Sequence, residues 1–196
     1  MLLKPPVVSL APRMWTERDV ADQLALQHLA WAYCHAIDRR DYALLRTLYH
    51  DDAIEDHGAM FCGGPDAYAA WLPSMMAGWA ATVHSIGNML FLIDGDSAEG
   101  ELQTVAYHRT IATAMTILAR EIVVGGRYLD RYLKRDGMWR FFRRSLVLDW
   151  YEDRALQRGD GPALDDGVAT GQPDASDAVY ARLALFAGSR GQSVMR

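Results

Sequence analysis

The stretch Trp31–Tyr49, WAYCHAIDRRDYALLRTLY, and the shorter stretch Val83–Asn88, VHSIGN, carry most of the polar chemistry in an otherwise apolar part of the chain. The first predicts the end of one helix, a turn at DRRD and the start of a second helix. The second opens a long apolar strand. Together they supply a phenol from Tyr33, a carboxylate from Asp38 and an imidazole from His84, and we expect these groups to share one site.

Helical periodicity predicts the first helix at 17–37, with Thr16 and Asp19 as a capping box. Its apolar face consists of residues that recur at steps of three and four: Leu26, Leu29, Ala30, Tyr33 and Ile37. On an ideal helix Tyr33 and Asp38 lie about 140° apart, so both can face one pocket only if the helix ends near Ile37. Asp41 is expected to cap the second helix.

The rest of the chain predicts a short strand at 53–57 and a third helix at 66–80, which contains Pro73. Longer strands are expected at 82–93, 98–111, 121–134 and 138–151. Arg135-Asp136-Gly137 is a strong hairpin signal between the last two. Because helices precede an antiparallel meander, the predicted fold class is α+β and not alternating α/β.

At 196 residues and 21.9 kDa, the chain fits one domain, expected at 17–152, with an N-terminal arm at 1–16 and a C-terminal loop and short helix at 153–196. The loop is expected at 158–174. The net charge of −5 argues against a nucleic-acid partner, which favours a basic face.

No signal peptide and no apolar run of roughly 20 residues is apparent in the sequence, so we expect a cytoplasmic protein with no membrane partner. Cys34 and Cys62 lack zinc-like spacing with histidine and are expected to be reduced thiols.

The order of elements and the strings YCHAIDRRD, YHDDAIEDHG, VHSIGN, AYHR, GGRYLDRY and RDGMWRF resemble the SnoaL-like branch of the nuclear-transport-factor-2-like superfamily over residues 17–152. The resemblance implies a cone-shaped α+β barrel, in which a curved antiparallel sheet wraps around a long N-terminal helix. Similar members include bile acid 7α-dehydratase, scytalone dehydratase and hexachlorocyclohexane dehydrochlorinase. These lyases act without metal or organic cofactor and assemble as trimers through the outer sheet face, so the resemblance implies the same here.

The resemblance also implies residue roles. The catalytic aspartate of the family falls on Asp38, its catalytic histidine on His84 and a catalytic tyrosine on Tyr33. A cavity arginine of the last strand falls on Arg144, or on Arg143 if a bulge shifts the register. A second histidine falls approximately on His108, which shares a strand face with small residues and is expected in the pocket.

These residue types suit β-elimination, which needs a base for a C–H proton and help for a departing oxygen. The pKa of histidine, ordinarily about 6.5, suits the base role, and a carboxylate behind the ring would fix its tautomer. Tyr33 and Arg144 could stabilise the oxygen. Strand alternation puts Asn88 on the face of His84, where it lines the pocket or pairs with that histidine. His57 is expected to contact substrate from the end of its short strand.

The sequence therefore favours a lyase for a hydrophobic cyclic or aromatic hydroxylated compound, releasing water or a small fragment such as formaldehyde. A double-bond isomerase or an epoxide hydrolase could use the same pocket, although no dense set of inward aspartates supports an aspartate-base isomerase. A non-catalytic binding module is a third alternative, and it predicts that Asp38 and His84 lie beyond hydrogen-bond reach. In that case Asp38 is a solvated turn residue and His84 a structural one.

Overall fold

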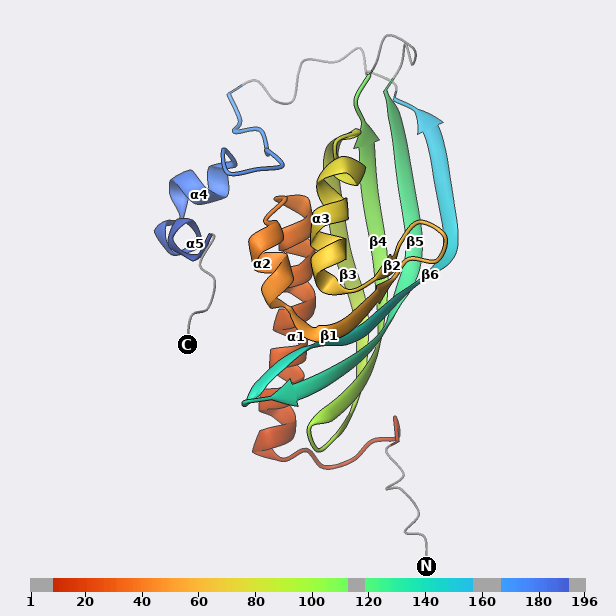
Figure 1. The fold of residues 1–196 in the computed structure, drawn as a ribbon, viewed down its shortest axis with the longest axis vertical. Helices are drawn as coiled ribbons and strands as arrows, with labels where there is room; N and C mark the ends of the chain where they lie inside the picture. Colours follow the sequence, from red (N-terminus) through yellow and green to blue (C-terminus); the bar gives the residue numbers. More distant parts are fainter. Residues whose placement is uncertain (1–8, 113–118, 157–166, 191–196) are drawn as a thin grey trace, which may run out of the picture.

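In the computed structural model, a long N-terminal helix lies against the concave face of a curved sheet, with two shorter helices beside it (Figure 1). The structure describes residues 9–112, 119–156 and 167–190. The helices are α1 (Glu17–Asp38), α2 (Tyr42–Thr47), α3 (Pro65–Met76), α4 (Ala178–Arg182) and α5 (Ala184–Ser189). The strands are β1 (Tyr49–Asp56), β2 (Cys62–Gly63), β3 (Trp79–Asp94), β4 (Ser97–Thr110), β5 (Arg120–Arg135) and β6 (Met138–Ala155). The predicted α+β cone is confirmed.

Local sequence determines where α1 and α2 begin. The Thr16 hydroxyl accepts the backbone N–H of Asp19, and the Asp19 carboxylate accepts the backbone N–H of Thr16, so the expected capping box is present. Asp41 caps α2 by accepting a backbone N–H of its first turn. Between the two helices Arg40 adopts a positive φ of 48°, and the chain reverses there. This turn leaves Asp38 as the last residue of α1.

The six strands are ordered β2-β1-β6-β5-β4-β3. β1 and β6 are parallel, whereas every other neighbouring pair is antiparallel. The predicted hairpin between β5 and β6 is confirmed: Asp136 and Gly137 have positive φ values of 52° and 77°, as a type I′ turn requires. The predicted alternation along β4 is also confirmed, because Leu102, Thr104 and Ala106 are buried and the residues between them are exposed.

A β-bulge in β3 changes which residues face the interior. Ile86 pairs with Thr104 and Met89 pairs with Leu102, so two residues of β3 oppose a single residue of β4. Beyond the bulge Met89 takes the inward position that strict alternation assigns to Asn88.

A second bulge acts on β6. Its pairing with β5 shifts between Phe141 and Arg143, which leaves Phe142 as the extra residue. The shift turns Arg144 into the interior and leaves Arg143 outside, where it bonds to Asp56 at 2.9 Å. The open choice between the two arginines is thereby decided in favour of Arg144 as the inward residue.

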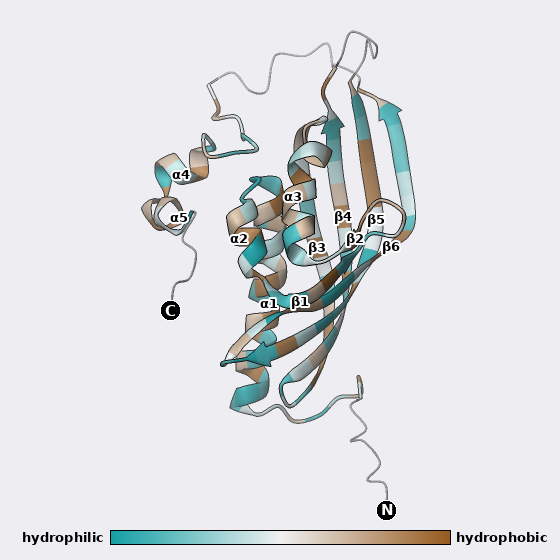
Figure 2. Ribbon diagram, viewed as in Figure 1, coloured by the Kyte–Doolittle hydropathy of each residue, from teal (hydrophilic) through white to brown (hydrophobic). Residues whose placement is uncertain are grey.

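The core fills the space between the helices and the inner sheet face, and Figure 2 shows hydrophobic segments of α3 and β5 in the middle of the molecule. It is rich in aromatic residues, namely Tyr33, Tyr49, Tyr68, Tyr128, Tyr132, Trp139 and Phe141. Each buried ring removes roughly 150–250 Å² from water, so these side chains dominate the packing. Gly126 lies beside β6, where a Cβ atom would approach the Val147 carbonyl oxygen to 2.4 Å. Only glycine fits there without a shift of the strand.

Several predicted boundaries differ from the structure. The third helix ends at Met76 and not at residue 80, because Gly78 and the start of β3 follow it, and Pro73 lies within it. The predicted single C-terminal helix is two short helices, α4 and α5. Residues 1–8 of the expected arm and 158–166 of the expected loop lie outside the described residues.

The C-terminal segment packs against the last turn of α1. Arg39 pairs with the buried carboxylate of Asp177 at 3.5 Å. His35 Nε2 lies 3.2 Å from the Tyr180 hydroxyl. Burial of His35, followed by the charge of Arg39, lowers the pKa of this histidine. Within the described ranges, no helix is both long and apolar enough to cross a membrane.

Candidate active site

Asp38 and His84 meet where the end of α1 crosses β3. The Asp38 Oδ1 atom lies 2.7 Å from Nδ1 of His84, and Oδ2 accepts the His84 backbone N–H at 2.9 Å. The Thr82 hydroxyl donates a third hydrogen bond to Oδ1 at 2.9 Å. Three donors from one strand therefore hold the carboxylate against the imidazole.

This contact defines how the imidazole can act. With Nδ1–H donated to Asp38, the lone pair of His84 is on Nε2, and no hydrogen bond to Nε2 is present among the described residues. The side chains of His84 and Asp38 are 10% and 13% exposed. The pair is thus largely shielded from water but not sealed, and Nε2 can take up a proton while Asp38 stabilises the resulting cation.

A second imidazole lies beside the first. The ring centroids of His108 and His84 are 5.4 Å apart and nearly perpendicular, and Trp79 packs against the other histidine ring at 5.0 Å. Burial, followed by the charge of the neighbouring histidine, lowers the pKa of His108 to about 4. His108 is therefore neutral near pH 7, and its Nδ1 atom is buried without a hydrogen-bond partner in the described chain.

Tyr33 does not join this pair. α1 continues through Asp38, so the condition for both residues to face one pocket is not met, and the expectation of direct contact is wrong. The Tyr33 hydroxyl lies 2.9 Å from the Tyr68 hydroxyl in the core. Burial raises the pKa of Tyr33 well above its ordinary value, which keeps the phenol protonated.

Arg144 lies in the same deeper layer as Tyr33. It is 0% exposed and makes a bidentate contact with Asp130, Nε to Oδ1 at 2.9 Å and Nη2 to Oδ2 at 2.7 Å. The rings of Tyr33, Tyr128 and Phe141 surround its guanidinium at 4.1–4.2 Å. Burial opposes its charge, but the Asp130 carboxylate outweighs this and keeps the pKa of Arg144 above its ordinary value. Only Nη1 lacks a partner in the described chain, so Nη1 is what it could offer a ligand.

Two other predicted site residues lie elsewhere. Asn88 is exposed and donates to the Gln103 side chain at 3.1 Å, because the bulge in β3 turns it away from His84; its expected place in the pocket is wrong. His57 lies 2.7 Å from the fully buried carboxylate of Glu55. No contact links His57 to the Asp38–His84 pair in the described part of the chain.

Several polar residues of the interior are missing from the sequence-based prediction. Thr82 is two residues before His84, so strand alternation could have indicated it. Glu55 alternates with Ala53 and His57 in the same way, and it accepts a hydrogen bond from a buried tyrosine. Asp130 offered no such signal, because its pairing with Arg144 depends on the bulge in β6. Among the described residues, no three His, Cys, Asp or Glu side chains are grouped to hold a metal ion.

The fold and this inward histidine–carboxylate pair place the protein in the nuclear-transport-factor-2-like superfamily. Residues 18–145 match the SnoaL-like domain, and the chain belongs to this family, which confirms the resemblance drawn from the sequence. It is 27% identical over 139 residues to the uncharacterised protein Rv2910c of Mycobacterium tuberculosis, covering 67% of this chain and 88% of that protein.

Two solved structures are similar to the chain. A candidate scytalone dehydratase from Novosphingobium aromaticivorans is 22% identical with a TM-score of 0.62, over 76% of this chain and 99% of that one. A type 2 hexachlorocyclohexane dehydrochlorinase, LinA, is 18% identical with a TM-score of 0.64, over 74% of this chain and 97% of that one. At these identities the likeness shows a shared fold.

The low pKa of His108 predicts a stability effect in acid. The folded-state pKa of about 4 is below the unfolded value of about 6.5, so the contribution is present above pH 6.5 and is lost as the pH falls toward 4. We expect His108→Asn to lose less unfolding free energy than the wild type across this window, measured by urea unfolding at stepped pH. His28→Asn, at an exposed position, is the control and should follow the wild type. Parallel curves for all three proteins would contradict the prediction.

The burial of Arg144 predicts a large difference between two adjacent arginines. Arg144→Met leaves the Asp130 carboxylate buried without its partner and should cost about 3–5 kcal/mol of unfolding free energy. Arg143→Met removes a half-exposed pair with Asp56 and should cost less than about 1 kcal/mol. Urea unfolding of the two variants measures both values. Equal losses would mean that Arg144 is not an essential part of the core.

Proposed function

We propose that the protein is a cofactor-independent lyase that eliminates water or another small fragment from a hydrophobic cyclic or aromatic hydroxylated compound. The observation that carries the proposal is the 2.7 Å contact between Asp38 and Nδ1 of His84, which leaves Nε2 as the base. Histidine and carboxylate pairs of this geometry suit proton abstraction near neutral pH.

In the proposed reaction, Nε2 of His84 takes a proton from a carbon next to the carbon that bears the hydroxyl group. The C–H electron pair forms the C=C bond, and the C–O bond breaks. The departing hydroxide receives a proton from the imidazolium, so water leaves and His84 returns to its neutral form. Asp38 stabilises the imidazolium between the two steps.

Residues around the pair support an oxygen-bearing apolar substrate. Neutral His108 can hydrogen-bond an oxygen without competing for the proton, and Trp79 supplies an aromatic surface beside it. Arg144 Nη1 could hold a polar substituent that reaches the deeper layer. Membership of the SnoaL-like family and the dehydratase and dehydrochlorinase among similar folds favour elimination over the isomerase and hydrolase alternatives.

The non-catalytic alternative is less well supported. It predicts that Asp38 and His84 lie beyond hydrogen-bond reach, and the two side chains are in direct contact. A module that only binds ligand would also have no need for a base whose second nitrogen is available.

The dyad is tested with His84→Ala and Asp38→Asn on a substrate found by screening hydroxylated cyclic compounds for appearance of a conjugated double bond. Positioned acid–base groups contribute roughly 10²–10⁴-fold, so each variant should lose at least about 100-fold in kcat. Ser85→Ala, on the outward face next to His84, should retain wild-type kcat. Full activity in both dyad variants would end the proposal. Incorporation of ¹⁸O from labelled water into the product would identify a hydrolase instead.

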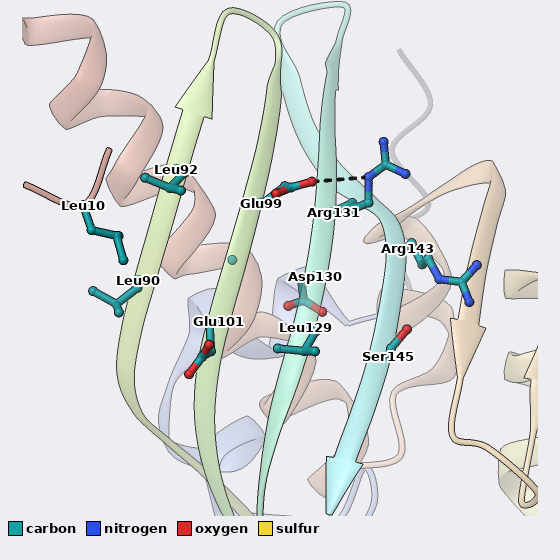
Figure 3. A pocket seen from close by; sticks show the side chains of 11 residues that line it. Leu10, Leu90, Leu92, Glu99, Glu101, Leu129, Asp130, Arg131, Arg143 and Ser145 are labelled. Carbon is teal, nitrogen blue, oxygen red and sulfur yellow. Dashed lines mark ion pairs between the residues drawn. The ribbon is translucent and has the colours of Figure 1, made fainter. Parts of the chain in front are cut away.

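We also propose that the protein is a cytoplasmic homotrimer that contacts its copies through the outer sheet face. Apolar residues on this face are exposed, including Leu90 and Leu129. They line a cavity of about 440 Å³ that also contains Leu10, and charged side chains ring it (Figure 3). Exposed apolar groups rimmed by polar residues are typical of protein interfaces.

The trimer is tested by light scattering coupled to size exclusion. The wild type should have a mass three times the 21.9 kDa of one chain, and Leu129→Glu should shift it to a smaller species by burying charge in the interface. Met60→Glu, an exposed position outside the sheet face, should leave the mass unchanged. A monomeric wild type would contradict the assembly but not the proposed reaction.

A further inference from the structure

Thr104 is a buried polar residue that the proposed reaction does not use. Its side chain faces the interior from β4 and the residue is only 4% exposed. The hydroxyl oxygen is buried and has no hydrogen-bond partner in the described chain. A threonine in this position is unusual, since buried hydroxyl groups are nearly always bonded to protein or to a ligand or water.

The surroundings of Thr104 are small on the side toward His84. Ala106 is the next inward residue of β4 and pairs directly with His84, so Thr104 lies on the diagonal from the histidine, at about 7–8 Å for such neighbours. On β5 the residue opposite Thr104 is Gly126, which carries no side chain. Leu102 closes the next inward layer. The hydroxyl therefore borders the space in front of the base.

His108 occupies the corresponding place on the other side. It is two residues beyond Ala106 on the same strand face, and its Nδ1 atom is also buried without a partner in the described chain. Four residues separate Thr104 from His108, which is about 13 Å along an extended strand. Two unpartnered polar atoms thus flank His84, one on each side.

We infer that Thr104 is a substrate-binding residue, and that the substrate has two fused rings with an oxygen substituent at each end, one bonded to Thr104 and the other to His108. The carbon that loses its proton then lies between them, opposite Nε2 of His84. The Thr104 hydroxyl can donate to a carbonyl oxygen or accept from a hydroxyl group, so either oxygen function fits. This inference rests on the proposed function, because it names the substrate class of that same site.

The inference is tested by binding to the full chain, using naphthalene, 2-naphthol and 2,6-dihydroxynaphthalene as probes in fluorescence titrations. The wild type should bind 2,6-dihydroxynaphthalene most tightly. Thr104→Val keeps the side-chain shape and removes the hydroxyl, so it should weaken 2,6-dihydroxynaphthalene about tenfold and leave naphthalene unchanged. Thr104→Ser, which keeps the hydroxyl, should stay within about threefold of the wild type.

Urea unfolding of the same variants separates binding from structure. A ligand-binding threonine without a protein partner predicts that Thr104→Val is at least as stable as the wild type. A destabilised Val variant that binds all probes as the wild type does would assign Thr104 a structural role and overturn the inference. Failure of 2,6-dihydroxynaphthalene to bind, or equal binding of all three probes, would overturn it too. The dyad test stands independently, because it is read as turnover in variants of His84 and Asp38.

Discussion

The contact between Asp38 and His84 joins the end of the longest helix to the strand at one edge of the sheet, and much of the architecture depends on it. One carboxylate accepts three hydrogen bonds from β3, so the helix end, the backbone of the strand and the imidazole are positioned together. The same bonds satisfy a carboxylate that is largely removed from water, where an unpaired charge would be strongly destabilising. Structural need and chemical use therefore coincide in one group.

The interior has two polar layers of different character. Near Asp38 and His84 the groups are neutral or singly paired, and two polar atoms are without a protein partner. In the deeper layer Arg144 is bonded to Asp130 and enclosed by aromatic rings. The first arrangement can respond to a ligand, whereas the second is largely saturated by its own contacts. This contrast assigns chemistry to the first layer and cohesion to the second.

The sequence was sufficient to predict the fold class, the capping residues, the β5–β6 hairpin and the pairing of Asp38 with His84. Those features follow from local chemistry or from strings shared with a family. The errors arose where one extra residue changes the pleat: a bulge in β3 turned Asn88 outward, and only the bulge in β6 made Arg144 the inward arginine. Tyr33 was misplaced because the helix extends one residue further than a shared pocket requires. Nothing local marks such positions, since partner strands determine them.

The bulge in β3 also makes the length of this strand as important as its composition. Residues before it, including Thr82 and His84, face inward only because two residues oppose one at the irregularity. Loss of a single codon there would restore a regular ladder and, with the later half of the strand held in place, exchange the two faces of the earlier half. Evolution can therefore replace side chains along β3 freely on its outer surface, while insertions and deletions are closed to it.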